Sequence, residues 1–188
     1  MAIELKKRQP FDLTKRDPGL RKILAGLSWG PTAVNGIVPD CDLALFMLAS
    51  TNKVPGEKFF VFYNNLLSED GSVEHIGDSR DGAGAGDAEV IEIDLSKVVT
   101  EVVQIVFAVT IHEAEQRGHD FGNVRNAAVR IVNNANGEEL CKFTLTEQFS
   151  NADSLVIGRL YRDQKDWKFE AMGDGFGGGL GALVELYA

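Results

Sequence analysis

Short apolar segments separated by turn-forming residues dominate the chain. They are rich in Val, Ile and Phe and are bounded by Gly, Asn, Asp and Pro, a pattern typical of β-strands. The predicted strands are Leu43–Leu48, Lys58–Tyr63, Val90–Leu95, Val102–Ile111, Ala127–Val132, Glu139–Leu145, Ser154–Arg162 and Trp167–Gly173. Because no helical pattern recurs between them, we expect a mainly β fold, an antiparallel β-sandwich with a few short helices.

Turn signals separate these segments. Asn136-Gly137 lies between two predicted strands, and Asn-Gly is a strong hairpin signal. A second turn is predicted over residues 68–72. Short helices are predicted at Pro18–Leu24, Glu113–Arg117 and Gly181–Leu186. A length of 188 residues fits a single domain over residues 1–188.

Charge is unevenly distributed along the chain. The formal net charge is −9, which argues against a nucleic-acid partner because phosphate backbones require a basic surface. Residues 1–24 nevertheless carry seven basic and three acidic side chains, a local charge of +4, which leaves −13 for the rest. An acidic body of this kind suggests cation binding as the first hypothesis to test.

The two cysteines and the hydropathy of the chain indicate the cellular compartment of the protein. Cys41 and Cys141 belong to no CxxC pair, and we expect two buried, reduced thiols. The basic N-terminal residues are not followed by the apolar region of a secretory signal. No apolar run approaches the ~20 residues that a membrane helix needs. We therefore expect a soluble, cytoplasmic protein.

The most chemically distinctive segment is an acidic loop within residues 75–95. Four acids, Asp78, Asp81, Asp87 and Glu89, flank a Gly-Ala run at 82–86. Calcium prefers six to eight oxygen ligands that mix carboxylates with carbonyls. The loop offers both kinds, with Gly82 and Gly84 as candidate carbonyl donors. The segment therefore predicts a Ca²⁺ site.

Other known loop motifs fit this segment less well. Its GxGxG spacing differs from the GxGxxG of a dinucleotide site, and it lacks the GK[ST] ending of a phosphate loop. An EF-hand requires Gly at loop position 6, where this chain has Ala83, and no flanking helices are predicted. A solvated acidic loop without metal remains the alternative.

A second acidic pair precedes a predicted strand. Asp40 and Asp42 flank Cys41 at the start of Leu43–Leu48. In an extended chain, residues two apart point to the same face, so both carboxylates would be directed at one site and Cys41 at the packed side. We expect this pair to share a metal with the acidic loop.

Catalytic motifs are not found. His112-Glu113-Ala114-Glu115-Gln116 has Gln where the zinc motif HExxH requires its second His. No GxSxG nucleophile motif occurs, and neither cysteine comes with an identifiable base. His75 and His119 are isolated and are expected to be structural or exposed. These motifs therefore give no support for zinc-protease or nucleophilic catalysis, and a hydrolase that uses the acids as an acid/base pair is a third possibility.

Motifs along nearly the whole chain, in order, resemble those of the TerD tellurium-resistance family. They are Gly26-Leu27-Ser28-Trp29, Asp40-x-Asp42, Phe60–Leu66, Asp70–Val73, His75-x-Gly77-Asp78, Gly82–Glu89, Val109–His112, Phe121-Gly122, Leu160–Arg162, Trp167–Phe169 and Gly178–Leu180. The resemblance implies a calcium-binding β-sandwich without enzymatic activity that takes part in bacterial stress responses, including tellurite resistance.

The resemblance also implies a ligand set and partners. The family's acidic motifs match Asp40, Asp42, Asp78, Asp87 and Glu89. Other tellurium-resistance proteins are the implied partners, with at most peripheral membrane association, and the oligomeric state stays open. A metal-independent interaction scaffold with a degenerate acidic loop is the alternative function.

This sequence departs from the family pattern at several acidic positions. Gly30, Ala85 and Ala88 stand where the family usually carries Asp, and Ala83 where it usually carries Glu. Asp81 stands where Thr is usual and restores one carboxylate. Because calcium affinity rises with ligand charge, we expect one well-filled site and a weak or empty second one.

Overall fold

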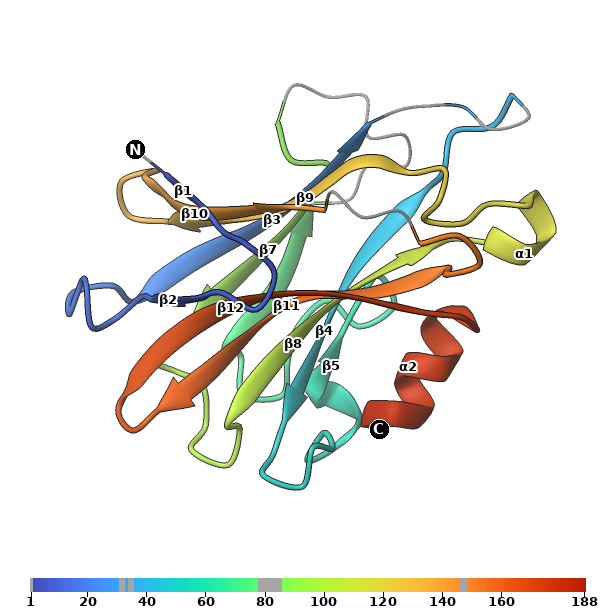
Figure 1. Cartoon of the computed structure of the whole chain (residues 1–188). Coiled ribbons are helices and arrows are strands. Elements are labelled where there is room, and N and C mark those ends of the chain that lie inside the picture. Colours follow the sequence, from blue (N-terminus) through green and yellow to red (C-terminus); the bar gives the residue numbers. More distant parts are fainter. Residues whose placement is uncertain (1, 31–32, 34–35, 78–85, 146–148) are drawn as a thin grey trace.

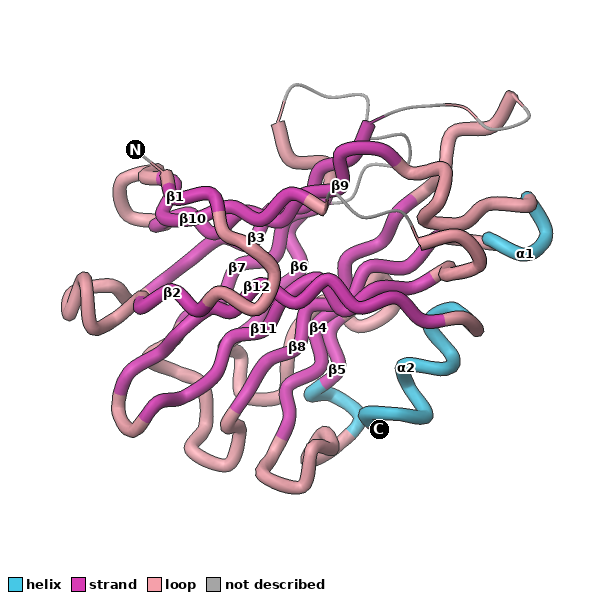
Figure 2. The backbone as a smooth tube through the Cα atoms, viewed as in Figure 1, coloured by secondary structure: helices cyan, strands magenta, loops and turns pink. Residues whose placement is uncertain are grey.

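Two layers of β-sheet pack face to face in the computed structural model, which describes residues 2–30, 33, 36–77, 86–145 and 149–188. Figures 1 and 2 show the two sheets crossing the molecule, with a helix against the outer side of one of them. This is the β-sandwich that the sequence predicts.

Each sheet has six strands in the described part of the chain. In spatial order, the first sheet consists of β1 (Ile3–Glu4), β10 (Glu139–Thr144), β9 (Arg125–Asn133), β3 (Lys22–Gly30), β7 (Glu89–Asp94) and β6 (Val73–Gly77). The second consists of β2 (Pro10–Asp12), β12 (Asp166–Phe176), β11 (Ser154–Asp163), β8 (Gln104–Ile111), β4 (Cys41–Leu48) and β5 (Phe60–Val61). The helical segments are η1 (Glu57–Phe59), α1 (Ala114–Arg117) and α2 (Gly179–Tyr187).

Strand pairing is antiparallel throughout the described sheets except between β1 and β10, which run parallel. β1 and β10 lie far apart in the sequence, so no tight hairpin has to join them and they can pair in parallel. The Asn-Gly hairpin is confirmed: Gly137 adopts a positive φ of 73° in the turn between β9 and β10.

The second sheet buries apolar side chains on both faces. Along β4, Cys41, Leu43, Leu45 and Met47 enter the core between the sheets. The alternate residues of β4, including Ala44, Phe46 and Leu48, pack instead with Leu183 of α2 on the outer face. This two-sided burial explains why the sequence of β4 reads as a continuous apolar run.

One predicted helix is wrong. The segment Pro18–Leu24 was expected to be helical, but it contains a turn followed by the start of β3. Leu and Ala in KILAG favour a helix locally, yet Ile23, Ala25 and Leu27 alternate into the core with the period of a strand. Tertiary burial therefore overrides the local preference.

The other helices were predicted correctly. α1 falls within the predicted Glu113–Arg117, and α2 extends Gly181–Leu186 by a few residues at its N-terminal end. The predicted strand Lys58–Tyr63 is shorter in the structure, where η1 occupies its beginning. Strands β1, β2 and β6 were not predicted. In the described part of the chain, no helix has the length and apolar character needed to cross a membrane.

The turn at residues 68–72 positions β6 through one carboxylate. Asp70 Oδ1 accepts hydrogen bonds from the hydroxyls of Ser68 and Ser72, both at 2.7 Å, and Oδ2 accepts one from the Val99 amide at 3.1 Å. Although partial burial acts to raise the pKa of Asp70, the hydrogen bonds from Ser68 and Ser72 outweigh it and lower the pKa.

We expect Asp70→Ala to lower the free energy of unfolding by about 1–2 kcal/mol at pH 7, because it leaves these donors without their acceptor. A lowered native pKa gives stability that is present above the unfolded value near 4 and is lost as the pH falls through the native value. Urea unfolding at pH 7 and pH 3 checks both points. An equal deficit at the two pH values contradicts this account.

Candidate metal centre

The start of β4 is fixed by contacts with two other strands. The indole Nε1 of Trp29, on β3, donates to the Pro39 carbonyl at 3.1 Å. The amide of His112, just after β8, donates to the Asp40 carbonyl at 2.8 Å. Cys41 then pairs with Ile111 in the β4–β8 register. These contacts hold the acidic pair at one end of the sandwich.

Side chains alternate at this point as the sequence predicts. Cys41 is 1% exposed and lies in the core between the sheets. Asp42 lies on the opposite face of β4, with 16% of its side chain exposed, and its Oδ2 is 4.0 Å from Nδ1 of His112. The prediction that Cys41 faces the packed side is therefore confirmed.

Glu89 is the buried acid of this region. It begins β7 in register with Leu27 of β3 and is only 1% exposed. Its Oε2 lies 3.0 Å from Nε2 of His75, on β6, and 3.5 Å from the amide nitrogen of Leu43, on β4. A carboxylate from the first sheet thus reaches the backbone of the second sheet next to Asp42.

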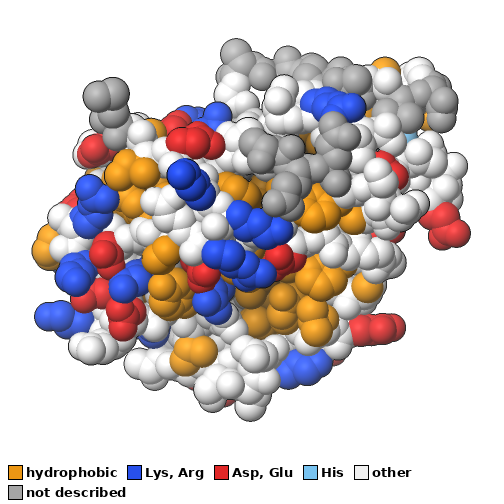
Figure 3. All heavy atoms as spheres, viewed as in Figure 1, with side chains coloured by type: hydrophobic (Ala, Val, Ile, Leu, Met, Phe, Trp, Pro, Cys, Tyr) orange, Lys and Arg blue, Asp and Glu red, His pale blue; other side chains and the backbone are white. Residues whose placement is uncertain are grey.

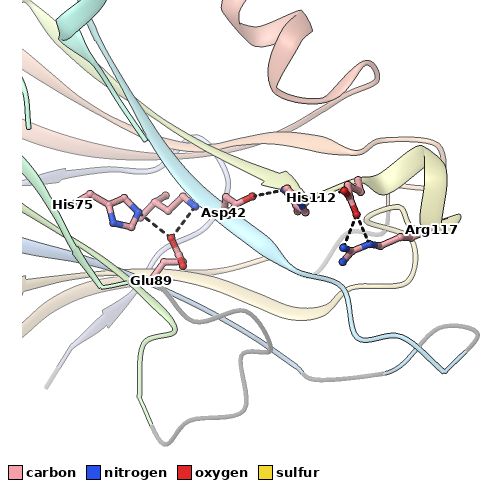
Figure 4. A network of polar contacts seen from close by, with 7 residues as sticks. Asp42, His75, Glu89, His112 and Arg117 are labelled. Carbon is pink, nitrogen blue, oxygen red and sulfur yellow. Dashed lines mark hydrogen bonds and ion pairs between the residues drawn. The ribbon is translucent and has the colours of Figure 1, made fainter. Parts of the chain in front are cut away.

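Figure 4 shows this line of contacts, which runs from His75 through Glu89 to the start of β4 and on to His112 and Arg117. Arg117 is bound by Glu113, whose Oε2 lies 2.6 Å from its Nη2. The polar network therefore joins the two sheets to α1.

Three of the predicted ligands, Asp40, Asp42 and Glu89, lie close enough to Cys41 to affect the pKa of its thiol. Burial raises the pKa of the Cys41 thiol well above its ordinary value, and the negative charges of Asp42, Asp40 and Glu89 raise it further. Asp42 and Glu89 also stand on either side of the β4 backbone at Leu43. The Glu89 carboxylate, at the end of the acidic loop, thus lies near the start of β4 that carries the Asp40/Asp42 pair.

Asp87 is oriented differently. Its two carboxylate oxygens lie 2.7 and 2.9 Å from Nε of Arg130, on β9, and Nη1 of Arg130 also contacts Glu139 at 3.1 Å. The Asp87 carboxylate lies over Gly26 of β3, where an added Cβ would come within 2.0 Å of Oδ2. Here Asp87 forms an ion pair on the first sheet and does not join Glu89.

The remaining predicted ligands, Asp78, Asp81, Gly82 and Gly84, lie outside the described residues. Among the residues that the structure describes, no group of three or more His, Cys, Asp or Glu side chains is arranged to hold a metal ion. The described acids therefore contribute part of a ligand set, of which Asp40, Asp42 and Glu89 are the members that lie near one another.

A cavity of about 340 Å³ adjoins Asp42 on the outer face of the second sheet. Asp42, His112, Glu113 and Asp153 are among its lining residues. Asp153 is already engaged, because its Oδ1 accepts the amide of Gly179 at the start of α2 at 2.7 Å. The cavity thus extends the acidic character of this end toward the C-terminal helix.

Sequence reasoning missed two histidines of this network. His75 was expected to be structural or exposed, and it is buried against Glu89; His112 was considered only within a failed zinc motif, and it lies beside Asp42. His75 alternates with exposed residues of β6, which gives a burial signal, but the sequence carries no signal that pairs it with Glu89.

Fold and site together define a β-sandwich with a partly buried group of oxygen donors at one end. Residues 1–187 match the TerD domain model, and the chain belongs to this family of tellurium-resistance and stress-response proteins.

Relatives support this assignment over the full length. The chain is 43% identical to the tellurium resistance protein TerD of Serratia marcescens over 187 residues, covering 100% of this chain and 97% of the relative. It is also 43% identical to general stress protein 16U of Bacillus subtilis (strain 168), again over 100% of this chain and 97% of the relative.

A solved structure agrees in fold. A homologue of the telluride resistance protein TerD from Streptomyces coelicolor A3(2) superposes with a TM-score of 0.69 at 20% identity. The superposition covers 88% of this chain and 96% of the homologue.

The thiols are expected to be inert in the native protein. Both cysteines are free and buried, and burial together with the charge of Glu139 raises the pKa of Cys141 to about 12. At pH 8 only about one Cys141 thiol in ten thousand is then a reactive thiolate. We expect Ellman's reagent to label Cys141 only after denaturation. Stoichiometric labelling of the native chain within minutes would contradict this prediction.

Proposed function

We propose that this protein is a non-enzymatic calcium-binding module of the tellurium-resistance and stress-response type, which acts in the cytoplasm through calcium-dependent contacts with other proteins. The observation that carries the proposal is the buried Glu89 carboxylate, held next to the acidic start of β4. Burial of an ionised carboxylate is costly unless nearby positive charge or hydrogen bonds compensate for it. A divalent cation at this end would supply such charge.

The donor chemistry fits calcium. Asp40, Asp42 and Glu89 offer carboxylate oxygens, and calcium takes six to eight oxygens in flexible geometry. The adjoining loop carries Asp78 and Asp81, with the carbonyls of Gly82 and Gly84 as further donors by sequence. Magnesium demands near-octahedral geometry and dehydrates reluctantly, so it should compete poorly on such a set.

Zinc fits less well. Its preferred protein ligands are Cys and His, and the nearby imidazoles already contact carboxylates: His75 contacts Glu89, and His112 lies beside Asp42. Cys41 points into the core on the other face of β4. No arrangement of soft ligands around one centre is therefore available among the described residues.

Two ion-pair contacts favour a second candidate function, a metal-independent interaction scaffold. Arg130 neutralises Asp87, and His75 contacts Glu89. These acids thus have protein partners without calcium. In either function the proposed binding partner is another protein of the stress-response system, and the net charge of −9 argues against nucleic acid.

We expect calcium to raise the melting temperature, and Glu89→Gln to remove most of this effect. A ligand that binds only the native state stabilises it by about 2.7 kcal/mol at a hundredfold excess over its Kd. Thermal melts in EGTA, in calcium and in magnesium measure this change in melting temperature. Asp94→Asn is the matched control, because Asp94 is also buried but lies at the opposite end of β7 and accepts from Ser96.

Each outcome of these melts decides between the two functions. A calcium-dependent shift that is lost in Glu89→Gln and kept in Asp94→Asn supports the calcium module. Coincident melts of the parent chain with calcium and with EGTA would establish the metal-independent scaffold instead. A shift of the same size in magnesium would contradict a site selective for calcium.

The ion pair between Asp87 and Arg130 gives a separate test of the ligand set. If Asp87 ligates calcium, it must leave Arg130, and the guanidinium then competes with the ion. We expect Arg130→Gln to increase calcium affinity by about threefold to tenfold, measured by calorimetry. Arg159→Gln is the control, since Arg159 pairs with Glu170 in the same manner on the second sheet. Equal affinities in both variants and the parent chain would exclude Asp87 as a ligand.

A further inference from the structure

A basic cavity lies at the opposite end of the sandwich from the acidic centre. Glu89 begins β7, whereas Leu95, immediately after its end, lines this cavity of about 550 Å³. At ~3.3 Å per residue, the two ends of β7 are about 20 Å apart. Strand β11 shows the same separation, because Ser154 lies beside the acidic end and Arg162 lines the cavity.

Charge at this cavity is opposite in sign to that of the whole protein. Lys15, Arg21, Arg162 and Lys165 line it together with a single acid, Asp166. Two of these cations come from the basic segment 1–24, which the calcium proposal leaves without a role. Figure 3 shows Lys and Arg side chains, with acids among them, at the end of the molecule where the β2–β3 connection lies in Figure 1.

Few of these cations are neutralised locally. Elsewhere in the described structure, Arg130, Arg159 and Lys168 each form an ion pair with a carboxylate. Lys15, Arg21 and Lys165 form none within 4.0 Å among the described residues, although the protein carries a net charge of −9. Lys15 contributes, after Lys168, to lowering the pKa of Asp163, but it forms no close ion pair with it. Cations without close ion pairs, gathered in an acidic protein, create a local positive potential.

Arg162 is held rigidly by neutral groups. Its Nε donates to the Val102 carbonyl at 3.0 Å and its Nη2 to the Val98 carbonyl at 2.8 Å. The guanidinium stacks over the ring of Trp167, 4.4 Å from its centroid. Burial lowers the pKa of Arg162, and its contacts on the protein side are carbonyl oxygens and an aromatic ring rather than a carboxylate. A fixed guanidinium of this kind is suited to an anion.

The acid in the cavity is already engaged. Asp166 Oδ1 accepts the hydroxyl of Thr14 at 3.2 Å, and that hydroxyl oxygen accepts the amide of Trp167 at 2.8 Å. Asp166 thereby ties the β2–β3 connection to the β11–β12 turn. It offsets only one of the four positive charges, so the lining keeps a net positive charge.

We propose that this cavity binds a small phosphate-containing anion that carries two or more negative charges. Its volume lies in the range of small-molecule sites. Arginine and lysine together provide planar donors and point charges for phosphate oxygens. A cavity of this size accommodates a compact phosphate compound, whereas a nucleic acid requires an extended basic surface, which a protein of net charge −9 does not offer.

The two tryptophans provide a built-in measurement. Trp167 underlies Arg162 in the cavity, whereas Trp29 donates to Pro39 at the acidic end. We would titrate ¹⁵N-labelled full-length protein with inorganic pyrophosphate and follow both indole N–H signals. Because pyrophosphate chelates calcium, the titration is run in EGTA, so its result does not depend on the calcium proposal.

We expect a saturable shift of the Trp167 signal with no change at Trp29. The double variant Arg21→Gln/Lys165→Gln should weaken binding about tenfold or more, since it removes two of the cations. Lys58→Gln/Arg125→Gln removes the same charge from exposed positions outside the cavity and should leave binding unchanged. Added salt should weaken the interaction.

Three results would overturn the proposal: an unchanged Trp167 signal up to about 10 mM pyrophosphate, equal weakening in both double variants, or binding unaffected by either. A second arm identifies the source of the phosphate. Sedimentation with phosphatidylglycerol vesicles that is lost in Arg21→Gln/Lys165→Gln and displaced by pyrophosphate assigns it to a lipid headgroup. Pyrophosphate binding without vesicle binding assigns it to a free phosphate compound.

Discussion

Burial of the Glu89 carboxylate between the two sheets is the constraint on which the acidic end depends. An acid that is 1% exposed needs compensating contacts, and two of its contacts come from different strands. His75 on β6 lies against its Oε2, and the Leu43 amide on β4 faces the same oxygen. The pairing of β7 with β3 sets the position of Glu89 itself. One buried carboxylate therefore links β6 and β7 of the first sheet to β4 of the second sheet.

The sandwich also separates charge along its length. Carboxylates gather where β4 and β7 begin, and cations gather around the turn between β11 and β12. The strands that connect these ends bury mainly apolar side chains in the core, so the two groups of charges stay apart. Over about 20 Å, solvent and salt reduce their mutual attraction to a small term. The two ends can therefore serve different ligands.

Much of the fold could be predicted from the sequence because strand signals are local. The Asn136-Gly137 turn and the alternation around Cys41 required no knowledge of distant contacts. The segment Pro18–Leu24 was wrongly predicted as a helix because its last residues have good helical propensity, and only burial and pairing with both neighbouring strands make these residues the start of β3. The acidic composition near Glu89 was visible, but its contact with His75 depends on the pairing of β6 with β7. The ion pair of Asp87 with Arg130 joins residues 43 positions apart, and no local pattern encodes it.

The absence of a side chain at Gly26 has a consequence for how this sequence can change over time. The Asp87 carboxylate occupies the space where a Cβ at position 26 would project, and Arg130 holds it there. Any larger residue at position 26 displaces the carboxylate, and the loss of the carboxylate leaves the guanidinium with Glu139 as its remaining acidic contact. Substitutions at the three positions are therefore not independent. A larger residue at position 26 would therefore require a compensating change at Asp87 or Arg130, although the three residues lie far apart in the sequence.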